Sequence, residues 1–157
     1  MSEECGICGI ELTDKFSYTL KCGHKFHYEC CMKSFNNISY TVNGKYNNQC
    51  HYCRKNSDYL QLVNGLKKIT PGIHCSIDKN DIDSFKKELK ENYNHMCGFT
   101  LTRGKNKGQS CGKNCILGYG YCKTHLEKMK SKYGDLVDLS LPTSMDKKND
   151  SQIIMNI

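Results

Sequence analysis

The chain has 157 residues, of which 38% are apolar, with twelve cysteines, six histidines and a formal net charge of +7. This length suffices for one or two small domains, and no apolar run approaches the roughly 20 residues that cross a bilayer, which excludes a membrane-spanning protein. The first residues, Met-Ser-Glu-Glu-Cys, offer neither the basic nor the apolar region of a secretory signal. We therefore expect a cytoplasmic or nuclear protein, whose reduced cysteines bind metal in preference to forming disulfides.

The first third of the chain carries eight potential metal ligands, arranged in close pairs. In chain order they are Cys5, Cys8, Cys22, His24, His27, Cys30, Cys50 and Cys53. Two ligands from one tight turn can occupy adjacent corners of a zinc tetrahedron, and four such half-sites complete two ions. The spacing therefore predicts two zinc sites. Cys31 adjoins Cys30 and stays an alternative ligand, although the two-residue gap after His27 favours Cys30.

Short elements of structure are expected between these ligands. Residues 16–20 alternate in polarity and predict a strand, beside which Lys25 and Phe26 can return as a hairpin. Residues 29–36 predict a short helix. A longer insert over 39–46 contains Asn-Gly, which favours a second, tight hairpin.

The ligand order resembles that of the RING finger in its two-histidine form, and the resemblance covers about residues 5–54. It implies a small zinc-stabilised α+β fold, a cross-brace built from a β-hairpin and a helix. In that arrangement the first zinc is bound by Cys5, Cys8, His27 and Cys30. The second zinc is bound by Cys22, His24, Cys50 and Cys53.

The resemblance also implies a function, that of a ubiquitin ligase. Such a protein positions a ubiquitin-charged conjugating enzyme for transfer to a lysine of a substrate protein, without a covalent intermediate. The family pattern implies contacts to the conjugating enzyme and ubiquitin from Ile7, Phe35 and Arg54. Two positions depart from the pattern, with Ser34 in place of a tryptophan and His51 in place of a proline. A RING used only for docking is therefore an alternative.

Beyond this first domain, taken as residues 1–56, we expect an irregular linker over 57–78. Apolar residues then recur at spacings of three and four, which predicts an amphipathic helix capped by Asn80 or Asp81. The helix stripe consists of Ile82, Phe85, Leu89 and Tyr93. We expect this stripe to pack against a neighbouring finger.

A second group of ligands predicts another zinc finger, within a domain taken as residues 79–134. Cys122 and His125 form one half-site at the start of a helix that runs to about residue 133. The other half-site must come from two of three cysteines, Cys97, Cys111 and Cys115. We favour the first two, with the third as the alternative ligand, and a cysteine-rich loop without metal is the competing interpretation. The chain is thus expected to hold two or three zinc ions.

This second frame resembles a small finger that accompanies RING domains in proteins of large nucleocytoplasmic DNA viruses. The resemblance implies a viral protein that acts in the cytoplasm or nucleus of an infected cell. The remaining residues, 135–157, are expected to form a flexible tail.

The positive charge is concentrated in residues 97–132, which hold eight basic side chains and one acidic residue, Glu127. Such a segment suits a polyanionic partner. The alternative function is therefore a non-catalytic zinc-binding protein that binds nucleic acid or another partner through this segment. Tyr119 and Tyr121 are candidates for stacking on bases. The candidate basic contacts are Arg103, Lys105, Lys107 and Lys113.

Overall fold

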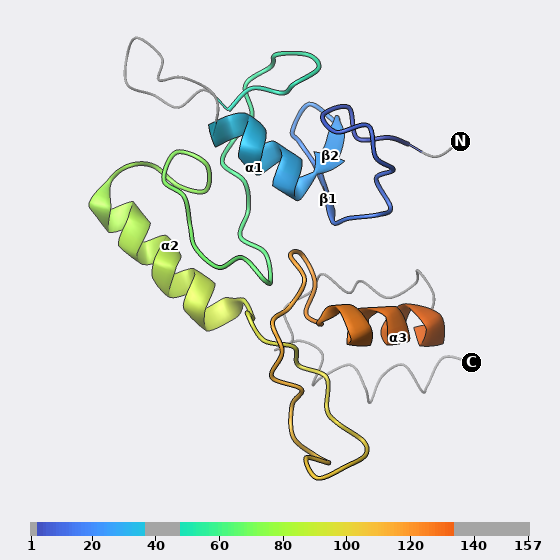
Figure 1. Cartoon of the computed structure of the whole chain (residues 1–157). Coiled ribbons are helices and arrows are strands. Elements are labelled where there is room, and N and C mark those ends of the chain that lie inside the picture. Colours follow the sequence, from blue (N-terminus) through green and yellow to red (C-terminus); the bar gives the residue numbers. More distant parts are fainter. Residues whose placement is uncertain (1–2, 37–47, 134–157) are drawn as a thin grey trace, which may run out of the picture. The chain divides into compact units, whose positions relative to one another are not determined.

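The structure is a computed structural model that describes residues 3–36 and 48–133. Its elements are β1 (Ser17–Thr19), β2 (Lys25–His27), α1 (Tyr28–Asn36), α2 (Lys79–Asn92) and α3 (Lys123–Tyr133), as Figure 1 shows. The chain divides into two compact units. Unit 1 comprises Met1–Gln61 and Ile69–Phe85, and unit 2 comprises Leu62–Lys68 and Lys86–Ile157.

Two of the sequence predictions fall outside the described residues, namely the hairpin at 39–46 and the tail at 135–157. Among the described residues, no helix has both the length and the apolar character needed to cross a membrane.

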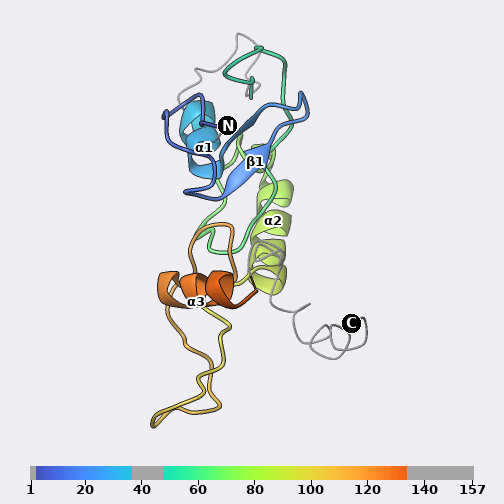
Figure 2. The same ribbon diagram turned by 90° about the vertical axis from the view of Figure 1, so that its right-hand side faces the viewer.

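The predicted hairpin and helix form the centre of unit 1. β1 pairs antiparallel with β2, with Tyr18 opposite Phe26, and Gly23 makes the turn at a φ of 87° that favours glycine. β2 runs directly into α1, and both views show α1 beside the two-stranded sheet (Figures 1 and 2). This strand-to-helix junction places His27 at the end of β2 and Cys30, three residues later, in the first turn of α1.

The core of unit 1 is small and rich in aromatic side chains. Its buried residues outside the ligand set include Leu12, Leu20, Phe26, Tyr28, Phe35, Leu60, Ile69 and Ile73. A core of this size stabilises a domain only weakly, and small domains usually need a metal, disulfides or a partner in addition.

The segment 57–78, for which the sequence suggests a linker, carries buried side chains and is shared between the two units. Within unit 1, the N–H of Leu60 donates to the carbonyl of Ile73 at 2.8 Å. Asn48 donates its side-chain amide to the carbonyl of Gly72 at 2.9 Å. The first bond joins two parts of the segment to each other, and the second attaches the segment to the rest of unit 1.

A buried histidine joins this segment to α1. Thr70 donates its N–H to Nδ1 of His74 at 2.9 Å, and Nε2 of His74 lies 3.2 Å from the hydroxyl of Tyr28. That hydroxyl donates to the carbonyl of Gln61 at 2.6 Å. Because Nδ1 accepts a hydrogen bond, the ring proton sits on Nε2 and the ring is neutral. Burial lowers the pKa of His74 below its ordinary 6.5.

This arrangement predicts a pH-dependent difference between the protein and its His74→Phe variant. The unfolded chain takes up a proton on His74 near pH 6.5 and the folded chain does not, so the stabilisation is full above pH 6.5 and is lost below it. We expect the variant to be less stable by about 1–3 kcal/mol at pH 8, through the unpaired Thr70 N–H. Denaturant titrations of the zinc-loaded proteins should show this difference narrowing towards pH 5.5, and a constant difference would contradict a neutral buried ring.

The N-cap of α2 lies two residues before Asn80, the first of the two predicted caps. Asp78 is the N-cap, because its carboxylate accepts the N–H of Asn80 at 2.8 Å, and its carbonyl accepts the N–H of Ile82 at 3.0 Å. The expected cap Asp81 instead accepts a hydrogen bond from the hydroxyl of Ser76. Of the predicted apolar stripe, Leu89 is the residue that is fully buried.

Unit 2 contains a two-stranded ribbon that is closed by a turn. Isolated bridges pair Met96 with Asn114 and Thr100 with Ser110. We call residues 96–101 and 109–114 the ribbon and residues 102–108 its tip. Figures 1 and 2 both show the ribbon and tip extending away from α3.

The stretch Leu62–Lys68 holds unit 2 together near the ribbon. Asn64 is fully buried, accepts the N–H of Asn94 through its side chain at 3.0 Å, and accepts the N–H of Gly118 through its carbonyl at 2.8 Å. Gly65 has a φ of 74°, and a Cβ there would lie 2.8 Å from the carbonyl oxygen of Ile116. A glycine is therefore required at position 65, where the backbone passes close to that of Ile116.

Candidate metal centres

Four of the eight ligands in unit 1 converge on one point. Their ligand atoms all lie within 4.8 Å of one another, and the residues are Cys5, Cys8, His27 and Cys30. Cys31 points elsewhere and is 1% exposed in the core. The adjacent cysteines therefore separate into one member of the cluster and one packing residue.

The distances in this first cluster fit a zinc ion. Nδ1 of His27 lies 3.3 Å from Sγ of Cys8 and 3.9 Å from Sγ of Cys30. Nitrogen and sulfur ligands of a tetrahedral zinc lie about 3.5 Å apart. Nε2 of His27 donates to the carbonyl of Glu11 at 2.9 Å, which fixes the tautomer and leaves the Nδ1 lone pair for a metal.

The other four ligands form a second cluster of the same kind, Cys22, His24, Cys50 and Cys53. Nδ1 of His24 lies 3.4 Å from Sγ of Cys22 and 3.5 Å from Sγ of Cys50. In chain order the ligands form four pairs, which are Cys5/Cys8, Cys22/His24, His27/Cys30 and Cys50/Cys53. The first and third pairs form the first cluster, and the second and fourth pairs form the second cluster. The second cluster joins Cys22 and Cys53, which are 31 positions apart in sequence.

The two Cys-x-x-Cys turns have the same backbone hydrogen bonds. In the turns from Cys5 and from Cys50, the first cysteine donates its N–H to the carbonyl five residues later, at 2.8 and 2.9 Å. The residue after the second cysteine donates its N–H to the carbonyl of the first cysteine, at 2.8 Å for Gly9 and 3.0 Å for Arg54. Both of these residues are left-handed, with φ of 71° and 60°. Arg54 thus occupies a position that glycine fills in the matching turn.

The electrostatics of the thiols favour a bound cation. Burial raises the pKa of Cys5, but backbone N–H donors, first that of His27 at 3.4 Å from its sulfur, lower it to about 7. Burial and the neighbouring thiols Cys8 and Cys5 raise the pKa of Cys30 to about 12. Close thiolates repel one another, so this cluster ionises fully only when a metal ion supplies positive charge.

Unit 2 holds a third cluster, formed by Cys97, Cys111, Cys122 and His125, with all ligand atoms within 4.8 Å. Nδ1 of His125 lies 3.4 Å from the sulfur of Cys97 and 3.4 Å from that of Cys122. The ribbon provides Cys97 and Cys111, Cys122 directly precedes α3, and His125 lies in the first turn of α3. Cys115, the alternative ligand of the sequence analysis, lies outside the cluster.

An aromatic stack covers the third cluster. Phe99 lies flat on the ring of His125, with centroids 4.0 Å apart and 17° between the planes. The ammonium of Lys128 lies 4.8 Å from the centroid of Phe99. Burial, followed by the positive charges of Lys128 and Lys113, lowers the pKa of His125 below its ordinary value. The ring is therefore neutral, which is the form that binds metal.

This stack is expected to slow the loss of zinc from the third cluster. Phe99→Ala removes the ring that orients His125 and shields it from water, so we expect zinc to leave this cluster about tenfold faster. Phe99→Tyr keeps the stack and serves as the control. Zinc transfer to a chromogenic chelator, followed over time, measures the rate, and equal rates for both variants would contradict a role for the stack.

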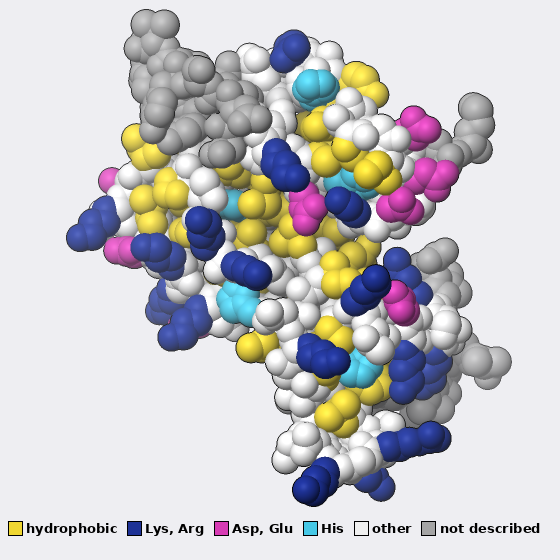
Figure 3. Space-filling view, in the orientation of Figure 1, with side chains coloured by type: hydrophobic (Ala, Val, Ile, Leu, Met, Phe, Trp, Pro, Cys, Tyr) yellow, Lys and Arg dark blue, Asp and Glu magenta, His cyan; other side chains and the backbone are white. Residues whose placement is uncertain are grey.

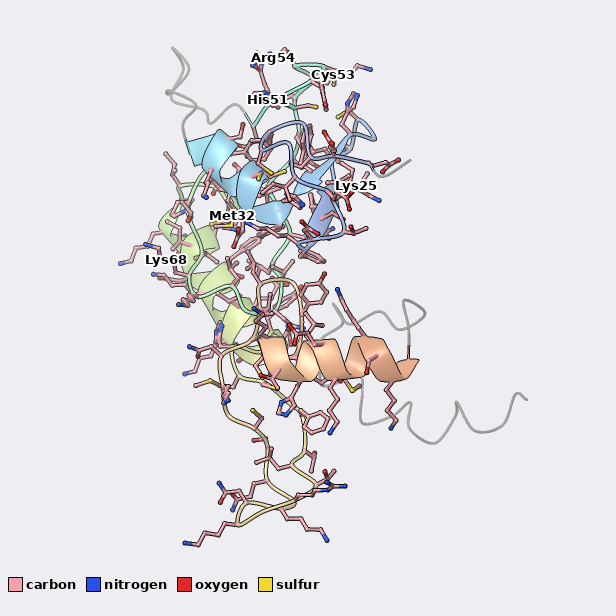
Figure 4. All side chains as sticks on the ribbon, turned by 45° about the vertical axis from the view of Figure 1, so that its right-hand side comes forward. Lys25, Met32, His51, Cys53, Arg54 and Lys68 are labelled. Carbon is pink, nitrogen blue, oxygen red and sulfur yellow. The ribbon has the colours of Figure 1, made fainter. Side chains whose placement is uncertain are left out.

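The predicted contact residues of unit 1 differ in exposure. Arg54 and His51 are exposed and lie on the loop that follows Cys50, together with Cys53 in Figure 4. Ile7 is half-buried. Phe35 is 2% exposed and belongs to the core, unlike the exposed Arg54 and His51.

Sequence reasoning missed one residue between these loops, Tyr52. Its ring stacks on Phe26 with centroids 5.5 Å apart and tilts against the ligand His24 at 5.4 Å, yet it is 59% exposed. A Cβ on Gly6 would overlap the ring. The turn from Cys5 and the turn from Cys50 therefore meet at Tyr52. The sequence feature that indicates this contact is Gly6, which lies between Cys5 and Cys8 and leaves room for an aromatic ring.

The predicted basic contacts are exposed, and the predicted stacking residues are not. Arg103, Lys105, Lys107 and Lys113 all lie at the surface. Tyr119 is half-buried, with the ammonium of Lys130 5.6 Å from its ring centroid.

Comparisons with protein-family models, with curated proteins and with solved structures found no match for this chain. The described residues form a small α+β fold with three Cys/His clusters that are compatible with zinc-binding fingers. Each cluster offers four protein ligands of nitrogen and sulfur, the set typical of a structural zinc site.

Proposed function

We propose that this protein is a RING-type ubiquitin ligase. The observation that carries the proposal is the interleaving of four ligand pairs into two clusters, which fits the RING cross-brace. With four protein ligands each, neither zinc of unit 1 would keep an open position for water or substrate. Zinc then stabilises the fold, and catalysis comes from positioning the reactants.

The surface proposed for the conjugating enzyme lies where the two Cys-x-x-Cys turns meet. The contact between Gly6 and Tyr52 joins these turns, so Ile7 and Arg54 belong to adjoining loops. Ile7 supplies an apolar contact of the kind that fills a groove on a partner. Exposed His51 stands at the place of the family's proline and enlarges the polar part of this surface.

In the proposed reaction, a lysine amine of the substrate attacks the thioester carbonyl that links ubiquitin to the conjugating enzyme. An isopeptide bond forms, and the enzyme's cysteine leaves as a thiol. Arg54 would hold the charged enzyme and ubiquitin in one orientation through its fork of N–H donors, which bind carbonyl oxygens in a fixed geometry. The ligase itself forms no covalent bond in this reaction.

The test is the discharge of ubiquitin from a panel of charged conjugating enzymes onto free lysine. Zinc-loaded protein should accelerate discharge from at least one enzyme, and Ile7→Ala should reduce the acceleration roughly tenfold by removing buried apolar area from the complex. The matched control is Ile77→Ala, because Ile77 is 58% exposed in unit 1 and lies outside the ligand turns. No acceleration across the panel would overturn the proposal and favour a RING that only docks partners.

A further inference from the structure

The tip of the ribbon in unit 2 is an exposed, self-contained turn. Leu101 donates its N–H to the carbonyl of Gln109 at 2.9 Å, and Gly108 donates back to Leu101 at 2.8 Å. A further hydrogen bond, from the N–H of Lys107 to the carbonyl of Gly104 at 3.2 Å, closes the turn. All residues from 102 to 110 are exposed. The tip is therefore ordered by its own backbone while its side chains face solvent.

The charge of this tip is positive and unbalanced. It carries Arg103, Lys105 and Lys107, and Lys113 follows on the returning strand. Within the described residues, no acidic side chain pairs with any of these four. Glu127, on α3, is the one acidic residue of the sequence from 97 to 132. In Figure 3, Lys and Arg side chains gather over the end of the ribbon without acidic neighbours.

The base of the ribbon is fixed by the third cluster. Cys97 donates its N–H to the carbonyl of Lys113 at 2.7 Å, and Cys111 donates to Phe99 at 2.8 Å. The sulfurs of Cys97 and Cys111 both belong to the cluster, which thus joins the two strands beneath the tip. A ribbon held at its base presents its basic tip with little loss of conformational entropy on binding.

The tip suits a nucleic-acid duplex better than a single strand. Proteins that bind single strands without sequence preference rely on aromatic side chains that stack on bases, and the tip, residues 102–108, contains none. Phe99, the aromatic residue of the ribbon, is already stacked on His125. Tyr119 lies half-buried under Lys130, and burial raises its pKa. The major groove of B-form DNA, roughly 12 Å wide, admits a two-stranded ribbon, whereas the major groove of A-form RNA is too narrow.

We propose that the ribbon of unit 2 binds double-stranded DNA, with its tip entering the major groove and Arg103, Lys105, Lys107 and Lys113 contacting phosphates. The uncharged tip residues, glycines and small polar side chains, allow the backbone to approach the groove floor. This inference concerns unit 2 and holds whether or not unit 1 acts as a ligase.

The experiment is fluorescence anisotropy of a labelled DNA duplex of mixed sequence, titrated with the zinc-loaded full chain at several salt concentrations. Four phosphate contacts predict a log–log salt slope of about −3.6, which is a loss of roughly 10²-fold in affinity between 50 and 200 mM salt. The triple variant Arg103→Gln, Lys105→Gln, Lys107→Gln should flatten the slope to about −0.9. Its zinc content should not change, because these side chains are exposed.

A matched triple variant of unit 1 removes the same charge from exposed lysines outside the ribbon, Lys25, Lys33 and Lys55. It should keep the wild-type slope, and an equal loss in both triple variants would overturn the assignment to the tip. Single-stranded DNA or an RNA duplex binding as tightly as duplex DNA would overturn entry into the major groove. Equal binding to heparin, with no preference for DNA, would overturn nucleic acid as the partner.

Discussion

Cys30→Ala is expected to release one zinc ion and unfold unit 1, whereas Cys31→Ala, one position later, should leave every ion in place. Cys30 contributes its sulfur to the first cluster, and Cys31 does not. Binding at a structural zinc site supplies on the order of 10 kcal/mol of folding free energy. The small core of unit 1 cannot replace that amount, because a protein's whole net stability is about 5–15 kcal/mol.

Native mass spectrometry counts the ions, and circular dichroism follows the unfolding of the same samples. Cys31→Ala removes a buried sulfur and lowers the midpoint of unfolding modestly without loss of metal. The same comparison applies in unit 2, where Cys111→Ala should lose zinc and Cys115→Ala should retain it. Metal loss from Cys31→Ala and not from Cys30→Ala would contradict the ligand set.

The ligand sets could be anticipated because spacing constrains which cysteines and histidines can share an ion. A pair such as Cys5 and Cys8 forms a half-site by itself, since its turn is local. Which pairs combine is a long-range property, and here it was anticipated from the resemblance to a family and not from spacing. The separation of Cys30 from Cys31 follows from helical geometry, because neighbouring residues on α1 point in directions about 100° apart.

Other features gave weak signals in the sequence. Leu60, Ile69 and Ile73 follow neither a helical nor a strand period, so the segment around them resembles a linker, although tertiary hydrogen bonds hold it in place. The role of His74 depends on Tyr28, which is 46 positions away. The burial of Phe35 depends on which face of α1 packs against the core. Each of these is set by packing between distant residues, which local patterns do not encode.

Under the proposed function, Arg54→Gly is expected to reduce ubiquitin discharge at least tenfold while leaving the protein as stable as the wild type, or more stable. A left-handed φ of 60° costs a residue with a side chain about 1 kcal/mol, and it costs glycine almost nothing. The matching turn places Gly9 at this position with the same hydrogen bonds. A strained residue that is kept where glycine would fit suggests that its side chain has a use.

Under the proposed function, that use is to hold the conjugating enzyme and ubiquitin together. We expect Arg54→Gly to reduce ubiquitin discharge at least tenfold with all zinc ions retained and an unchanged or higher unfolding midpoint. Arg54→Lys should also lose most activity, because a lysine ammonium lacks the planar fork of donors. Gly9→Ala is the control for the turn, and it should lower stability by about 1 kcal/mol. Full activity in Arg54→Gly would mean that the strained arginine is not used for transfer, and that any ligase contact surface lies away from this turn.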